Sequence, residues 1–444
     1  MQPRAANVAS LISQITTGGS NDLTYCFMET TKPAATLPGR VDPAEVGFDA
    51  DRLARIDRHF DRYLEDGRLA GWQVLLSRRG KVAHFGWNGL RDKESALPVE
   101  RDTIYRIYSM TKPITSVAAL MLWEEGAFEL STPIHRFIPS FKDVRVYVRG
   151  NATSPLTVPA QEPVRIWHLL THTSGLTYGF HHAHAVDEAY RSAGYEWSWP
   201  EGTDLAAACD TWARLPLLFE PGSEWNYGVS TDVLGRVVEV VSGQSLDRFF
   251  AERIFQPLSM VDTAFSAPEA EQPRLAALYA VAPSLPGPIR YDVLGDAALK
   301  PPTLFSGGGG LVSTTADYLR FARMLLGRGE LDGKRLLAPR TLAYMVRNHL
   351  PGGGDLESVG RPLFAETTFN GVGFGLGFSV VLDPVKEKVP GNPGAFAWGG
   401  AASTYFWVDP AEELIGIFMT QLLPSSTHPI RSELRQLVYQ ALID

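Results

Sequence analysis

The sequence predicts an α/β fold in which an antiparallel sheet flanked by helices is interrupted by a mostly helical inserted domain. Three observations indicate this class: strand pairs near both ends of the chain, an amphipathic helix beside each pair, and a helical middle. Each strand pair consists of two apolar runs around a short turn, which is typical of a β-hairpin. The runs are residues 72–77 with 81–87, and 404–408 with 414–419.

The two flanking helices are predicted from their apolar spacing. Residues 49–66 carry apolar side chains at three- and four-residue intervals among charges, which predicts a helix that covers the sheet with one face. These side chains are Leu53, Ile56, Phe60 and Leu64. Residues 430–442 repeat a helical pattern at the other end of the chain. Because both ends contribute a helix and strands, we expect them to form one layered domain.

The middle of the chain predicts helices joined by long connections rich in Pro, Gly and Trp. Ser230 is expected to cap a helix over residues 233–241, and residues 246–254 predict another. The predicted division is an N-terminal extension at 1–40, an α/β domain at 41–128 and 305–444, and a helical domain at 129–304.

Composition excludes several classes of function. The 444 residues are 45% hydrophobic and 20% charged, with a net charge of −8, so no basic field attracts nucleic acid. Two cysteines, Cys26 and Cys209, are too few for a disulfide framework and lack the paired spacing of structural zinc. The best candidate for a membrane helix, 117–123, has only seven residues and is far shorter than the ~20 that such a helix requires. Residues 8–15 are interrupted by polar side chains and predict no signal peptide, so we expect a cytoplasmic protein without membrane or nucleic-acid partners.

A serine and a lysine open the most apolar segment of the chain. Ser109-Met110-Thr111-Lys112 precedes residues 114–123, which are apolar almost all round and predict a buried helix. At three-residue spacing the hydroxyl of Ser109 and the amine of Lys112 share a face. A buried lysine without a carboxylate partner has a lowered pKa and can accept the serine proton. The structural alternative is that Ser109 caps the helix and Lys112 extends to solvent.

Four further blocks accompany this SxxK motif, in the order 168–175 (HLLTHTSG), 221–227 (PGSEWNY), 308–314 (GGGLVST) and 398–400 (WGG). Together they resemble the serine β-lactamase and penicillin-binding-protein superfamily, and more closely its esterase branch, the family VIII carboxylesterases. The likeness spans about residues 45–440. It implies the β-lactamase/transpeptidase-like fold, with a catalytic cleft between the sheet domain and the helical domain.

The resemblance also implies roles for particular residues. Ser109 would be the acylated nucleophile, Lys112 its base, and Tyr227 the proton shuttle to the leaving alkoxide. Chemistry agrees, because ester cleavage needs one group to take the serine proton and another to protonate the departing oxygen. Which of Lys112 and Tyr227 is the primary base stays open, since coupled groups share their titration. No metal or organic cofactor is implied.

The same resemblance places the oxyanion between the backbone N–H groups of Ser109 and Ala401. The preceding residues, Trp398, Gly399 and Gly400, stand where β-lactamases carry KTG, and the glycines allow a close backbone approach. Trp398 is expected to help shape the substrate pocket.

Two departures from the lactamase pattern favour neutral esters. Val229 stands where β-lactamases have an asparagine, and Trp398 replaces the KTG lysine that meets the lactam carboxylate. A charge-assisted hydrogen bond contributes about 1.5–3 kcal/mol, so its loss weakens carboxylate binding roughly ten- to a hundredfold. We therefore expect a carboxylesterase for short- to medium-chain esters with weak β-lactam hydrolysis. The alternatives are a β-lactamase or acyltransferase that uses the same residues, and a non-catalytic ligand-binding relative. No oligomeric state follows from the sequence.

The remaining candidates carry a structural and a functional interpretation. His181, His182 and His184 resemble a metal cluster by count, but no carboxylate or cysteine lies at ligand spacing, so a structural role is favoured. His168 and His172 are interpreted as parts of a helix end rather than as ligands. Four tryptophans before Tyr227 either pack a long loop or line the pocket: Trp197, Trp199, Trp212 and Trp225. The glycines at 307–310 lack the lysine of a phosphate loop and predict a tight turn before a helix at 315–326.

Overall fold

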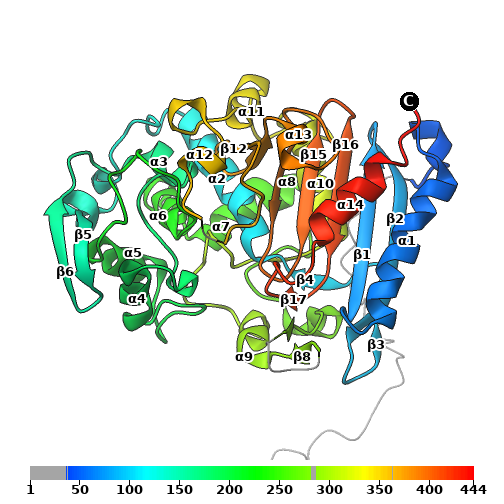
Figure 1. The fold of residues 1–444 in the computed structure, drawn as a ribbon, viewed down its shortest axis with the longest axis horizontal. Helices are drawn as coiled ribbons and strands as arrows, with labels where there is room; N and C mark the ends of the chain where they lie inside the picture. The colour runs from blue at the N-terminus through cyan, green and yellow to red at the C-terminus, as the bar shows by residue number, and fades with distance from the viewer. Residues whose placement is uncertain (1–36, 38, 282–286, 363) are drawn as a thin grey trace, which may run out of the picture. The chain divides into compact units, whose positions relative to one another are not determined.

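The central sheet contains eight strands in the order β12-β13-β14-β15-β16-β1-β2-β3, and neighbouring strands are antiparallel (Figure 1). The computed structural model describes residues 37, 39–281, 287–362 and 364–444. Both predicted hairpins are present, and their strands meet in mid-sheet, where β1 pairs with β16. The strands are β1 Gly71–Arg78, β2 Lys81–Asp92, β3 Leu97–Pro98, β12 Val372–Phe374, β13 Ser379–Val381, β14 Phe396–Gly399, β15 Tyr405–Asp409 and β16 Leu414–Met419. The predicted fold class is confirmed.

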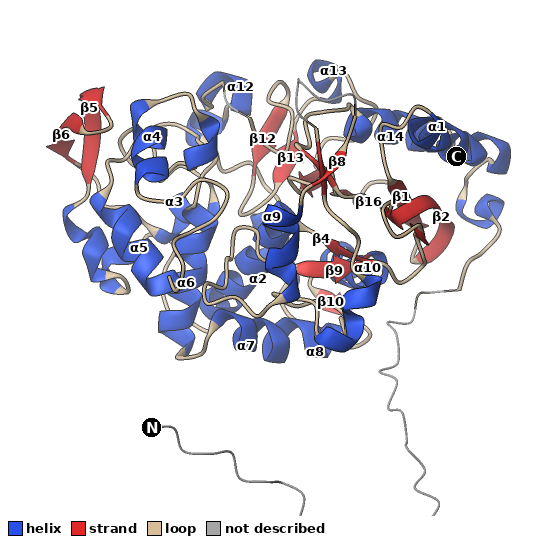
Figure 2. Ribbon diagram, turned by 90° about the horizontal axis from the view of Figure 1, so that it is seen from below, coloured by secondary structure: helices blue, strands red, loops and turns tan. Residues whose placement is uncertain are grey.

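Helices cover both faces of this sheet because its central strands bury side chains on both sides. α1 (Ala50–Glu65) and α14 (Ile430–Tyr439) lie on one face, and α2 (Thr111–Glu124) and α10 (Thr315–Leu326) lie on the other (Figures 1 and 2). Strand β16 shows the alternation, with Phe418 against Phe60 of α1 and Ile417 in the core that contains α2 and α10. The helices predicted at 49–66, 315–326 and 430–442 are therefore present.

Helices make up most of the regular secondary structure of the segment between residues 129 and 304, in line with the prediction. Its helices are α3 Ile166–Leu170, α4 Ala185–Ser192, α5 Leu205–Arg214, α6 Ser230–Ser242, α7 Leu246–Phe250, α8 Gln256–Leu258 and α9 Asp292–Gly295. A π-helical stretch, Ala251–Phe255, joins α7 to α8, so the helix predicted at 246–254 continues further. The described residues belong to one compact unit, 34–444, and the division into two domains stays a prediction.

A β-hairpin in this helical segment was not predicted. β5 (Arg145–Asn151) and β6 (Ser154–Pro159) pair at the end of the segment far from the main sheet (Figures 1 and 2). A β-bulge between Tyr147 and Arg149 interrupts the strict alternation by which a strand is identified. The other short elements are β4 Ile104–Arg106, β7 Tyr279–Ala280, β8 Ile289–Arg290, β9 Val312–Thr314, β10 Glu330–Leu331, β11 Lys334–Arg335, β17 Leu422–Leu423, α11 Pro339–Met345, α12 Leu356–Val359 and α13 Pro384–Glu387.

The predicted capping role of Ser230 is wrong. Val229 occupies the N-cap position of α6, and Ser230 is the first helical residue. The hydroxyls of Ser230 and Ser174 form a buried hydrogen bond of 2.8 Å. This bond connects the HLLTHTSG block to the helix that follows Tyr227.

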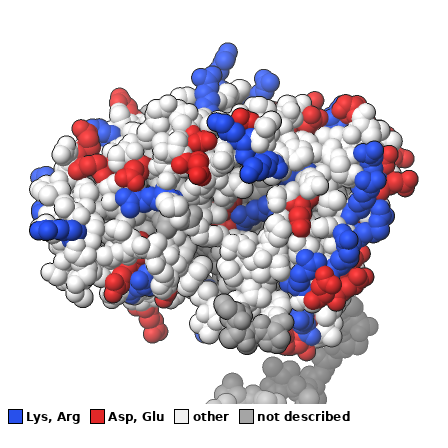
Figure 3. All heavy atoms as spheres, viewed as in Figure 1, with Lys and Arg blue, Asp and Glu red and all other residues white. Residues whose placement is uncertain are grey.

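Positive and negative side chains are both present over the face seen in Figure 3, and the blue side chains along its right edge have red ones beside them. In the described part of the chain, no helix combines the length and the apolar character needed to cross a membrane. The segment examined for a signal peptide, 8–15, lies outside the described residues.

Candidate active site

The start of α2 brings Ser109 and Lys112 together in the core. Ser109 lies in a 3-10 turn, Tyr108–Met110, that leads directly into the helix. Lys112 is 1% exposed, and its Nζ donates to Ser109 Oγ at 3.2 Å and to the Gly308 carbonyl at 2.8 Å. The structural alternative, with Ser109 as a cap and Lys112 in solvent, is therefore wrong. No side-chain cap precedes α2, and the amine faces the hydroxyl.

Tyr227 makes a second contact with Ser109 Oγ. Its hydroxyl donates to Ser109 Oγ at 2.6 Å, and its ring centroid lies 4.5 Å from Lys112 Nζ. His181 Nε2 bonds to the Tyr227 carbonyl at 2.7 Å, and Trp225 stacks on the tyrosine ring. Ser109 Oγ thus contacts both the Lys112 amine and the Tyr227 hydroxyl, the two groups to which the family resemblance assigned proton transfer.

Burial sets the charge state of these groups. Loss of hydration lowers the pKa of Lys112 to about 8, although the charges of Asp232 and Glu366 act in the opposite direction. Burial raises the pKa of Tyr227 well above its usual value, and the charge of Glu366 adds to this effect. At neutral pH the phenol is therefore protonated, and the amine is the group that exchanges its proton most readily.

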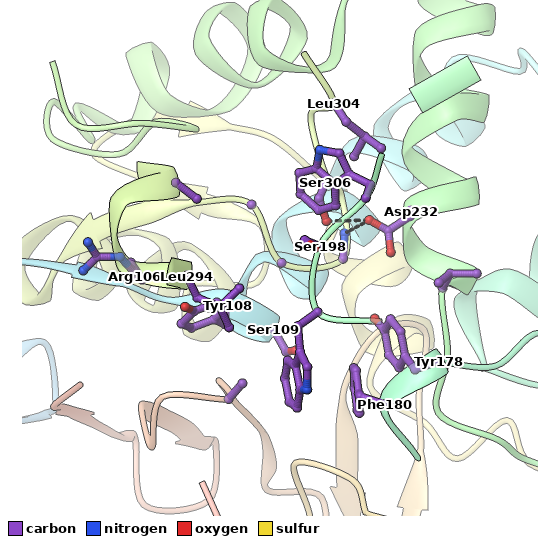
Figure 4. A pocket seen from close by; sticks show the side chains of 18 of the residues that line it. Arg106, Tyr108, Ser109, Tyr178, Phe180, Ser198, Asp232, Leu294, Leu304 and Ser306 are labelled. Carbon is purple, nitrogen blue, oxygen red and sulfur yellow. Dashed lines mark hydrogen bonds between the residues drawn. The ribbon is translucent and has the colours of Figure 1, made fainter. Parts of the chain in front are cut away.

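The sequence analysis missed Asp232, which organises the glycine loop beside Lys112. Its carboxylate accepts from Ser306 Oγ at 2.5 Å and from the Gly308 N–H at 3.0 Å (Figure 4). The Gly308 carbonyl accepts a hydrogen bond from Lys112, so Asp232 positions the amine indirectly by holding Gly308. The charge of Asp232 also raises the pKa of Lys112. A Cβ on Gly308 would collide with the Asp232 carboxylate. The only signal in the sequence is the position of Asp232 in the first turn of the predicted helix, five residues after Tyr227.

The strand end at 398–401 lies against the nucleophile turn. A Cβ on Gly400 would collide with the Ile107 carbonyl oxygen, so glycine permits this approach. Ala401 and Ser109 both line the same cavity. Trp398 is not among the residues that line the cavity: it is fully buried and packs edge-on against Tyr227 and Phe374. Trp398 therefore packs against the Tyr227 ring without lining the cavity.

The cavity above Ser109 has a volume of about 220 Å³, and aromatic side chains form a large part of its walls (Figure 4). Three of the four candidate tryptophans contribute to it, whereas Trp225 is buried behind Tyr227. Tyr178, Phe180 and Trp197 stack in sequence along one wall. The full aromatic lining consists of Tyr108, Tyr178, Phe180, Tyr195, Trp197, Trp199, Trp212, Tyr227, Phe265 and Phe364.

The histidines are used in hydrogen bonds and packing. His184 Nδ1 accepts the Val186 N–H at the start of α4, and His182 pairs with Glu196. His168 Nδ1 accepts the Arg165 N–H, and the His172 ring packs against Tyr227. Within the described residues, no three His, Cys, Asp or Glu side chains are grouped as metal ligands.

A buried serine hydroxyl between an amine and a phenol, beside an antiparallel sheet covered by helices, defines a serine hydrolase with the β-lactamase/transpeptidase-like fold. The chain belongs to the beta-lactamase family, whose family model, described as Beta-lactamase, matches residues 56–440. The resemblance inferred from the five sequence blocks is confirmed.

Relatives with similar sequences cover most of the chain. Protein Rv1367c of Mycobacterium tuberculosis is 38% identical over 364 residues, which are 81% of this chain and 87% of the relative. Esterase EstB of Burkholderia gladioli is 31% identical over 423 residues, 90% of this chain and 98% of EstB. Among solved structures, EstCE1, described as a hydrolase with promiscuous acyltransferase activity, is 28% identical with a TM-score of 0.75. That match covers 88% of this chain and 99% of EstCE1.

Proposed function

We propose that this protein is a carboxylesterase that works through a serine acyl-enzyme. The observation that carries the proposal is the pair of contacts at Ser109 Oγ, with Tyr227 at 2.6 Å and Lys112 at 3.2 Å, at the base of an apolar cavity. The esterase EstB, similar along nearly its whole length, and the hydrolase EstCE1 support this class of reaction.

In the proposed first step, the neutral amine of Lys112 accepts the Ser109 proton while Oγ attacks the ester carbonyl. The carbonyl oxygen becomes an oxyanion between the N–H groups of Ser109 and Ala401. When this tetrahedral intermediate collapses, the bond between the carbonyl carbon and the alcohol oxygen breaks, and Tyr227 donates its proton to the departing oxygen. The ammonium of Lys112 then returns a proton to Tyr227, which leaves the amine neutral again.

In the second step, water attacks the acyl carbonyl and gives its proton to the neutral amine of Lys112. Release of the carboxylic acid returns a proton to Ser109. An alcohol in place of water would give acyl transfer with the same residues, which is the activity named for EstCE1. The acyltransferase alternative therefore differs only in the acceptor.

Neutral esters suit this cavity better than carboxylates. The guanidinium of Arg106, the cation among the residues that line the cavity, is occupied by the carbonyls of Gly295 and Ala276. The acidic residue Asp232 also lines the cavity and repels an anionic substrate, whereas the charge of Glu366 is paired with that of Arg431. Val229 lines the cavity as well and offers no amide donor.

The test compares two chromogenic substrates with the purified protein. We expect kcat/KM for p-nitrophenyl butyrate to exceed that for a chromogenic cephalosporin by roughly tenfold or more, because Arg106, the one cation among the described residues that line the cavity, is already bound to carbonyls and does not meet the cephalosporin carboxylate. The methyl ester of the same cephalosporin is the control, since it restores neutrality without changing the ring. Faster turnover of the free acid than of the butyrate ester would reject the esterase assignment in favour of a β-lactamase.

The pH dependence of hydrolysis is a further expected result. Lys112 has to be neutral to accept a proton, and its pKa of about 8 means that protonation removes the active form below this pH. We expect kcat/KM to rise about tenfold per pH unit below the midpoint and to level above it. Measurement of kcat/KM for p-nitrophenyl butyrate from pH 5.5 to 9.5 tests this rise. A profile that is flat across the range would exclude an amine as the base.

A further inference from the structure

The peptide unit between Gly400 and Ala401 is held at its carbonyl end. The Gly400 carbonyl accepts from Arg431 Nη2 at 3.4 Å and from the Ser403 N–H at 3.0 Å. A trans peptide is planar, and its C=O and N–H point in opposite directions. Donors on the carbonyl therefore fix the direction in which the Ala401 N–H points on the other side. Ala401 is the residue of this unit that lines the cavity beside Ser109.

A buried carboxylate keeps the guanidinium in place. Arg431 is the second residue of α14, and its Nη2 pairs with Glu366, which is 1% exposed. Glu366 also accepts from Ser425 Oγ at 2.9 Å. Breaking such a pair would leave a buried charge without a partner, which is strongly unfavourable. The pair therefore maintains one orientation of the guanidinium.

Gly399 makes room for this arrangement. A Cβ at Gly399 would collide with the guanidinium nitrogens of Arg431, so the guanidinium lies directly against the end of β14. Gly400 is packed in the same way against Ile107, two residues before the nucleophile. The two glycines thus place the peptide between the nucleophile turn on one side and Arg431 on the other.

We infer that Arg431, held by Glu366, is a positioning residue for the oxyanion site: by binding the Gly400 carbonyl it aims the Ala401 N–H at the substrate oxygen. The inference rests on the proposed esterase function. A donor that is already aligned needs no reorganisation when charge develops, which is the basis of oxyanion stabilisation. A cation on the carbonyl also polarises the peptide, so the N–H becomes a stronger donor.

The same helix offers a matched control. Arg435, one turn further along α14, forms a buried pair with Glu387 and donates to the Pro390 carbonyl at 3.1 Å. It does not line the cavity above Ser109. Arg435→Met thus removes a buried ion pair from α14 without touching the Gly400 carbonyl.

The experiment measures steady-state hydrolysis of p-nitrophenyl butyrate by Arg431→Met, Arg431→Lys and Arg435→Met. Rates are expressed per active site titrated to completion with a p-nitrophenyl phosphonate, so that a partly folded variant is still measured. We expect Arg431→Met to lower kcat roughly 10- to 100-fold with KM within about twofold, because the donor is misaligned rather than removed. Arg431→Lys, which retains a donor for the carbonyl, should recover most of the rate. Arg435→Met should lower Tm and leave kcat unchanged.

A second readout reports the oxyanion directly. A trifluoromethyl ketone forms a tetrahedral oxyanion with the serine, and its affinity should fall in Arg431→Met by the same factor as kcat. If Arg431→Met does not fold, Arg431→Met with Glu366→Gln removes the unpaired carboxylate. Its kcat should lie below that of Glu366→Gln alone, the reference that accounts for the charge that Glu366 exerts on Lys112 and Tyr227. An equal loss of kcat in Arg435→Met, or unchanged kcat in Arg431→Met, would overturn the inference. Absence of ester hydrolysis by the unmodified protein would instead reject the proposed function.

Discussion

Ser109→Ala is expected to reduce ester hydrolysis roughly 10⁴- to 10⁶-fold, because among the described residues Ser109 carries the hydroxyl that bonds to both Lys112 and Tyr227. The variant should also lose the covalent product: after incubation with a p-nitrophenyl phosphonate, intact mass should show one phosphonyl group on the unmodified protein and none on Ser109→Ala. The loss would then be assigned to the nucleophile rather than to binding.

Ser116 provides the control for this substitution. It lies two turns along the same helix and is as deeply buried, but it contacts neither Lys112 nor Tyr227 through any hydrogen bond found in the described structure. Ser116→Ala should keep both turnover and the phosphonyl adduct. Retention of the adduct by Ser109→Ala would show that another residue is acylated and would refute the assignment.

The second large effect on hydrolysis is expected when the amine of Lys112 is removed. Lys112→Met keeps an unbranched apolar stem and deletes the basic nitrogen at its end, so kcat/KM should fall by roughly 10³-fold or more and the decline of the rate at low pH should disappear. Lys112→Arg distinguishes a base from a mere positive charge. A guanidinium cannot lose its proton near neutral pH, so this variant should be as inactive as Lys112→Met.

Thermal melting and phosphonate titration accompany these measurements, because Lys112 also donates to the Gly308 carbonyl and its loss changes the glycine loop. If Lys112→Arg retained most of the activity, the amine would be needed for its charge only. Tyr227 would then be the remaining candidate for the base, which is the question that the sequence left open.

Local periodicity was sufficient to predict most of the framework. The helices at α1, α10 and α14 and both hairpins of the main sheet follow from apolar spacing and turn residues within short windows. The β5–β6 hairpin was missed because a bulge breaks its alternation, and its strands pair only with each other and with a loop. Ser230 was misassigned because a serine before an apolar run indicates a cap equally well when it is the first residue of the helix.

The candidate site was predictable only where its residues are neighbours in sequence. The three-residue spacing of Ser109, in the 3-10 turn, and Lys112, in the first turn of α2, places them in contact, whereas Tyr227 entered through a family resemblance. Asp232 and Glu366 act through space from other segments, so no spacing rule identifies them. Trp398 was expected to line the pocket, but the alternation of β14 directs it into the core that supports Tyr227.

The groups at the site are brought together across long stretches of chain. The contact between Tyr227 and Ser109 joins positions 118 residues apart, and that between Lys112 and Gly308 joins positions 196 apart. Partly folded forms in which only local helices exist would therefore have no assembled centre. Regain of turnover after dilution from denaturant should thus coincide with the slowest spectroscopic change rather than with the return of helicity, which makes catalysis a direct reporter of complete folding.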